Sequence, residues 1–69
     1  SEDDLLQKLE NVLDMLPDRQ KQVFKMRYYD ELSYEEIANT LQLSEGALKA
    51  SYHHAVKKIE QYILETTTH

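Results

Sequence analysis

The residues best suited to contact another molecule are concentrated between Ala47 and Ile59. This stretch contains three lysines and two histidines and no acidic residue. Lysine side chains bind phosphate groups, and a histidine or serine side chain reaches the edge of a base through hydrogen bonds. The whole chain has a formal net charge of −5, which argues against a general affinity for nucleic acid. The stretch is therefore a local basic surface on an acidic protein.

The same residues do not form a catalytic or metal-binding site. The chain has no cysteine, which excludes a thiolate nucleophile and a cysteine-ligated metal. Neighbouring residues on a helix, such as His53 and His54, point about 100° apart. Neither histidine has a second histidine or a carboxylate four residues away, as a helical metal site requires. No serine, histidine and carboxylate are grouped for acid–base catalysis. We therefore expect a protein that is not an enzyme and that has no metal, cofactor or small-molecule substrate.

The sequence also lacks the features of a secreted or membrane protein. No apolar run approaches the roughly 20 residues that span a bilayer. The start of the chain, Ser1 to Asp4, is acidic, whereas a signal peptide begins with basic residues. We expect a cytoplasmic protein. Because the first residue is serine, we also expect this segment to be an excised piece of a longer protein.

The elements that position the basic surface are predicted to be helices. The chain contains one glycine and one proline, a composition typical of all-α domains. Apolar residues at three- and four-residue steps predict an amphipathic helix over residues 3–15. Pro17 cannot continue that helix and suits the first turn of the next, which extends from Asp18 to Tyr29.

Two serines mark the starts of the remaining helices. Ser33 and Glu36 have the spacing of a capping box, which starts a short helix ending near Leu41. Ser44 is the cap of a longer helix over residues 45–64. The last residues, 66–69, form a polar tail that is expected to fray.

The inner faces of these helices supply the predicted core. Its members are Leu5, Leu9, Val12, Leu13, Leu16, Val23, Phe24, Tyr28, Ile37, Ala38, Leu41, Leu48, Tyr52, Ala55, Val56, Ile59 and Ile63.

A short helix, a three-residue turn and a longer helix form a helix-turn-helix. The expected fold is all-α: a small four-helix domain over residues 1–65, with a winged-helix-like three-helix DNA-binding core and an additional N-terminal helix. The face of the last helix opposite its apolar stripe contains Ala47, Ala50, His54 and Lys57. Small residues there allow close approach to a major groove. The free backbone N–H groups at the start of this helix, around Gly46, suit one DNA phosphate.

Several short motifs resemble, in order and spacing, region 4 at the C-terminus of extracytoplasmic-function bacterial sigma factors of the sigma-70 family. The resemblance extends from about Leu5 to Ile59. Its motifs are Leu16-Pro17-Asp18-Arg19-Gln20, Val23-Phe24, Arg27-Tyr28-Tyr29, Leu32 to Ala38, Leu43 to Gly46, and Leu48-Lys49.

The resemblance implies a transcription initiation domain. Such a domain binds the flap element of RNA polymerase core and recognises the upstream −35 promoter element with its last helix. A domain that melts the promoter would precede it, and an anti-sigma protein is a further expected partner that would share the surface of the first three helices.

The resemblance also implies which residues contact double-stranded promoter DNA. Arg27 and Tyr34 match positions that touch the DNA backbone, and Ser33 and Ser44 lie at the matching helix starts. Together with the last helix, the expected DNA-binding set is Arg27, Ser33, Tyr34, Ser44, Gly46, Ala47, Lys49, Ala50, Ser51, His53, His54 and Lys57.

The chain departs from the family pattern at several positions. Family members commonly have threonine in place of Ala47 and arginine in place of Ser51, His54 and Val56. Arginine binds guanine through two hydrogen bonds, as serine and histidine do not. Either the DNA sequence that this chain recognises differs from that of the family, or its direct binding to DNA is weak. Gln42 stands where the family often has glycine, so a left-handed backbone there costs energy.

Two alternative functions fit parts of the sequence. A response-regulator-type, LuxR-like helix-turn-helix regulator shares the layout and dimerises through its last helix. An exposed apolar end at Tyr62, Ile63 and Leu64 would indicate this class. A protein-interaction domain that has lost DNA binding would account for the net charge of −5 and for the missing arginines.

Overall fold

The computed structural model describes residues 2–67, which form four α-helices. These are α1 (Glu2–Met15), α2 (Asp18–Tyr28), α3 (Tyr34–Leu41) and α4 (Glu45–Thr67). Residues 2–67 contain no strand, so the all-α prediction is confirmed and the winged-helix likeness is limited to the three-helix core. The first three helices end within one residue of their predicted positions.

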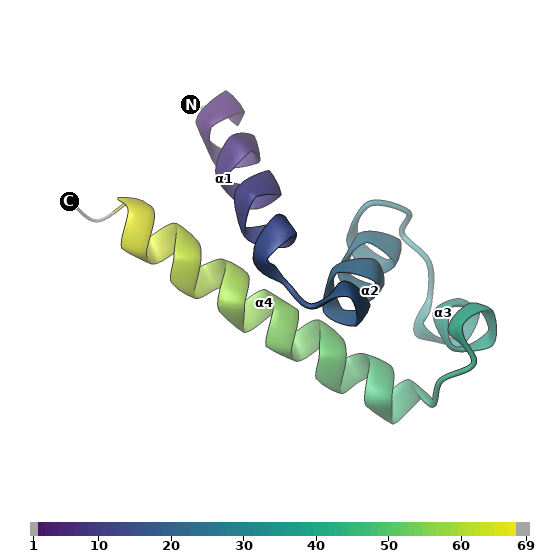
Figure 1. The fold of residues 1–69 in the computed structure, drawn as a ribbon. Helices are drawn as coiled ribbons and strands as arrows, with labels where there is room; N and C mark the ends of the chain where they lie inside the picture. Colours follow the sequence, from purple (N-terminus) through teal and green to yellow (C-terminus); the bar gives the residue numbers. More distant parts are fainter. Residues whose placement is uncertain (1, 68–69) are drawn as a thin grey trace.

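The long helix α4 is the element on which the other three pack. In Figure 1, α1 lies antiparallel to the C-terminal half of α4, while α2 and α3 lie against its N-terminal half. The Lys8 ammonium group in the middle of α1 donates a hydrogen bond of 3.4 Å to the carbonyl oxygen of Thr66 near the end of α4. Helix α2 packs against both α3 and α4 and so supports the helix-turn-helix that these two helices form.

The core consists of two groups of buried side chains that meet at Tyr52. The first group joins α1, α2 and α4 and contains Val12, Leu13, Leu16, Phe24, Ala55 and Ile59. The second joins α2, α3 and α4 and contains Val23, Ile37 and Leu48. Tyr52 is half-buried and packs against both groups. All nine buried residues belong to the predicted core.

Two residues predicted to be buried are exposed. Leu5 is 53% exposed because the N-terminal end of α1 has only the end of α4 beside it. Tyr28 is 56% exposed. One face of its ring stacks on Phe24 at a centroid distance of 5.2 Å, and the rest of the ring reaches solvent.

The end of α4 also differs from the prediction. The helix continues to Thr67 rather than ending at Leu64. The Thr66 hydroxyl donates to the carbonyl oxygen of Tyr62 at 2.9 Å, and the Thr67 hydroxyl donates to that of Ile63. The side chains of Thr66 and Thr67 thus bond to the preceding turn, and the fraying expected from the polar composition of the tail stays a prediction. The rest of the predicted tail, residues 68–69, lies outside the described residues.

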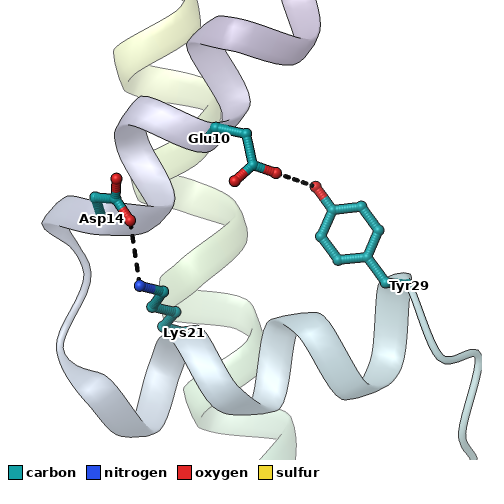
Figure 2. Close-up of polar contacts among 4 residues, drawn as sticks. All are labelled: Glu10, Asp14, Lys21 and Tyr29. Carbon is teal, nitrogen blue, oxygen red and sulfur yellow. Dashed lines mark hydrogen bonds and ion pairs between the residues drawn. The ribbon is translucent and has the colours of Figure 1, made fainter.

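Two polar contacts join α1 to α2 across the Pro17 joint (Figure 2). The Lys21 ammonium lies 3.2 Å from a carboxylate oxygen of Asp14. The Tyr29 hydroxyl donates a hydrogen bond of 3.3 Å to Glu10. Partial burial raises the pKa of Tyr29 above its ordinary value of 10.0, and the negative charge of Glu10 raises it further.

The raised pKa of Tyr29 predicts a loss of stability in alkaline solution. A folded-state pKa above the unfolded value of 10.0 gives stabilisation that is complete below that value and is lost as the pH rises through the folded-state pKa. Between about pH 8 and pH 11, the melting temperature of Tyr29→Phe should therefore fall less than that of the wild type. Equal decreases in both proteins would contradict this prediction.

The turn between α3 and α4 contains a left-handed residue that is not glycine. Gln42 has φ 58° and ψ 47°, a left-handed conformation that costs energy at a residue with a Cβ. Its backbone N–H donates to the carbonyl oxygen of Ala38, and its side-chain amide donates to that of Asn39 at 2.8 Å. These bonds complete the C-terminal end of α3.

We expect Gln42→Gly to raise the free energy of unfolding by about 0.5–1 kcal/mol, because glycine adopts this conformation without a Cβ clash. Urea denaturation measures the change. Gln42→Ala is the matched control, since it loses the same side-chain bond to Asn39 as the glycine variant but keeps the Cβ clash, and it should be no more stable than the wild type. A glycine variant less stable than the wild type would refute the prediction.

Candidate nucleic-acid interface

Both predicted serine caps are present at the helix-turn-helix. The Ser33 hydroxyl accepts a hydrogen bond from the Glu36 backbone N–H at 3.1 Å and donates one to the Glu36 carboxylate at 3.2 Å. The Ser44 hydroxyl accepts a bond of 3.1 Å from the Ala47 N–H. Ser33 and Ser44 therefore set the directions in which α3 and α4 begin.

The first half of α4 presents a basic outer face. Between Glu45 and Glu60 the helix has no acidic residue. Ser51 is half-buried, and the other predicted contacts on this helix are exposed. The exposed ones are Gly46, Ala47, Lys49, Ala50, His53, His54 and Lys57. The structure thus places these residues where a duplex could reach them.

Arg27, Tyr34 and Lys49 come together from α2, α3 and α4. The guanidinium carbon of Arg27 lies 5.2 Å from the centre of the Tyr34 ring. The ammonium nitrogen of Lys49 lies 5.6 Å from the same centre. Arg27 also donates a hydrogen bond of 3.4 Å to the carbonyl oxygen of Leu32. Three predicted DNA-binding residues therefore form one cluster at the edge of the outer face of α4.

The sequence indicates each of these three residues separately but not the contact between them. The available signal was an aromatic residue at the first position of α3, seven positions after an arginine. The position of Lys49 relative to that ring depends on how α4 packs on α3, which sequence spacing does not reveal.

The fold itself gives no reason for glycine at position 46. Its φ is not positive, and a Cβ built there would have no heavy atom within 4 Å. The role of Gly46 in close approach to DNA stays a prediction.

His53 and His54 are neighbours on the exposed face, with ring centres 6.3 Å apart. Within residues 2–67, no group of three or more histidine, aspartate or glutamate side chains is arranged to hold a metal ion. No helix in this part of the chain is both long enough and apolar enough to cross a membrane.

The apolar end of α4 is mostly covered. Tyr62 and Ile63 pack against the first core group, while Leu64 is 61% exposed. The three-residue exposed end that would indicate a response-regulator-type regulator is thus reduced to Leu64.

Comparison with known protein families identifies a family that matches most of the chain. Residues 6–59 match the family described as "Sigma-70, region 4". The matched segment contains most of α1, all of α2 and α3, and α4 as far as Ile59. No match was found among curated proteins or among solved structures.

Proposed function

This chain belongs to the sigma-70 region 4 family, and on that premise we propose that it is the promoter-recognition domain of an extracytoplasmic-function sigma factor. As a region 4 domain it recognises the −35 promoter element in transcription initiation and binds RNA polymerase. It is not an enzyme. The assignment to the extracytoplasmic-function subgroup is supported by the motifs from Leu16 to Lys49.

The single observation that best supports a DNA-reading role for α4 is its exposed face without acidic residues. We propose that this face enters the major groove. Ala47 and Ala50 are small enough for the helix to approach the bases closely, and His53 and His54 offer ring nitrogens to base edges. Lys57 lies on the same side, where its ammonium group can bind a phosphate.

The start of α4 is proposed to bind one phosphate. Ser44 already accepts bonds from the N–H groups of Ala47 and Leu48, through its hydroxyl and its carbonyl oxygen. The N–H groups of Glu45 and Gly46 precede these bonds and point out of the helix end. The Ser44 hydroxyl also keeps its own hydrogen for donation to a phosphate, whereas that of Ser33 is donated to Glu36.

The surface of α1 is proposed to serve protein partners. Leu5, Leu6 and Met15 are each more than half exposed, which leaves apolar area for RNA polymerase or an anti-sigma protein. Since promoter DNA and polymerase occur together in the bacterial cytoplasm, we propose that the protein acts there.

In vitro transcription from a promoter library tests this proposal, with the full-length protein that contains this segment and its core polymerase. Enrichment of one upstream motif supports it and supplies the target sequence. Without enrichment, although the protein is folded and bound to polymerase, the protein-interaction alternative would replace it. The family match leaves the response-regulator alternative without support.

A further inference from the structure

We propose that Tyr34 is a positioning residue. Its ring holds the side chains of Arg27 and Lys49 together, so that the two cations contact the DNA backbone as one unit. This inference rests on the proposed DNA-binding function. It assigns to Tyr34 a role that acts through two other side chains rather than through a contact of its own.

The geometry indicates that the Tyr34 ring is a platform on which the Arg27 and Lys49 side chains both rest. Arg27 lies 5.2 Å and Lys49 lies 5.6 Å from the ring centre, both within the distance of about 6 Å at which a cation is attracted to an aromatic ring. The two cations come from α2 and α4, and the ring belongs to α3. Both cations, from two different helices, therefore contact the same ring.

The ring is fixed by the core behind it. Tyr34 is half-buried and packs against the group formed by Val23, Ile37 and Leu48. It also meets the edge of Tyr52 with ring centres 6.3 Å apart and planes inclined by 78°. A ring held in this way restricts the long side chains that rest on it. Less side-chain freedom is then lost when DNA binds.

Both cations remain available to phosphate groups. Neither Arg27 nor Lys49 forms an ion pair with a carboxylate of residues 2–67, whereas Lys21 is paired with Asp14. The bond from Arg27 to the Leu32 carbonyl oxygen uses one of the five N–H donors of a guanidinium group. The remaining donors can bind DNA.

Nuclear magnetic resonance of the chain without DNA tests the platform directly. The Tyr34 ring current should shift the Lys49 Hε and Arg27 Hδ resonances upfield. Tyr34→Phe should preserve both shifts and Tyr34→Leu should abolish them. Tyr28→Leu is the matched control, because it removes an exposed ring that stacks on Phe24 and should leave both shifts unchanged. Absence of the shifts in the wild type would overturn the inference.

DNA affinity then tests the consequence, with the duplex enriched by the transcription experiment as the probe. Tyr34→Leu should bind at least about fourfold more weakly than Tyr34→Phe, which keeps the ring, since the cost of ordering one long side chain on binding is at least about twofold in affinity and two such side chains rest on the ring. Lys49→Ala should cost less affinity in the Tyr34→Leu background than in the wild type. The dependence of affinity on salt should become shallower in Tyr34→Leu, which simple loss of packing would not cause.

The outcomes separate this inference from the proposed function. Equal losses in Tyr34→Phe and Tyr34→Leu would show that the hydroxyl contacts DNA itself, and an unchanged Tyr34→Leu would show that the ring is irrelevant; either result overturns the platform. If the wild type binds no duplex although the ring-current shifts are present, the proposed DNA function fails, and the positioning role fails with it.

Discussion

Replacing Leu48 by alanine is expected to lower the free energy of unfolding by about 2–5 kcal/mol, the range for a leucine deleted from a well-packed core. Leu48 is fully buried and packs with Val23 of α2 and Ile37 of α3. Its side chain therefore helps to hold all three helices of the DNA-binding core together. A 69-residue domain has a total stability of only roughly 3–10 kcal/mol, so this variant should lose a large fraction of that stability.

Urea denaturation followed by circular dichroism measures the effect of Leu48→Ala. Leu6→Ala is the matched control because Leu6 is 56% exposed, and its free energy of unfolding should change by no more than about 0.5 kcal/mol. A loss below about 1 kcal/mol for Leu48→Ala would contradict the packing described above, because a cavity at this site should cost more.

The helices were predictable because the residues that start and end them act locally. Pro17 separates α1 from α2, and the hydroxyls of Ser33 and Ser44 cap α3 and α4. Such signals depend on residues a few positions apart, which the sequence displays directly. The left-handed conformation of Gln42 was not itself predicted, because the sequence indicated only that such a conformation would cost energy at a residue other than glycine.

The periodicity of apolar residues along a helix did not predict which of their side chains a second helix covers. Leu5 and Val12 lie on the same stripe of α1, yet Leu5 is 53% exposed and Val12 is buried. The difference arises because Val12 packs with side chains of both α2 and α4, whereas the N-terminal end of α1 has only the end of α4 beside it. α4 also continues through Thr66 and Thr67, which the polar composition of the tail does not indicate.

The candidate site was predictable residue by residue but not as an arrangement. Helical spacing separates Leu48 from Lys49 by about 100°, enough to place one in the core and the other at the surface. The meeting of Lys49 with Arg27 at the Tyr34 ring depends on the angles at which three helices pack. Those angles follow from the whole core, and no short motif determines them.

Reversing the charge of Lys49 is the substitution expected to affect function most. In Lys49→Glu, a carboxylate would face the phosphates and lie beside the electron-rich face of the Tyr34 ring, where the ammonium group now lies 5.6 Å from the ring centre. We expect the affinity for the promoter duplex to fall at least about tenfold, equivalent to about 1.4 kcal/mol. Transcription from the −35-dependent promoter by the full-length protein with core polymerase should fall to background.

Stability should distinguish this effect from that of Leu48→Ala. Lys49 is exposed, so its replacement should change the free energy of unfolding by no more than about 1 kcal/mol, mainly through the lost cation–π contact and the new repulsion from Glu45. The melting temperature should then decrease by at most about 8 °C. Lys49→Gln removes the charge without reversing it, and should reduce the slope of log affinity against log salt by about 0.9.

Lys58→Glu is the matched control for Lys49→Glu, because it makes the same change of charge at another position of α4. Lys58 lies farther along α4, where it borders a shallow groove with Met15 and Glu65, away from the Tyr34 platform. The two variants have the same net charge, so a general electrostatic effect would weaken transcription in both. A loss confined to Lys49→Glu would place the contact at the N-terminal half of α4. Normal transcription by Lys49→Glu would instead exclude Lys49 from the DNA interface, and Arg27 alone would then supply the positive charge at Tyr34.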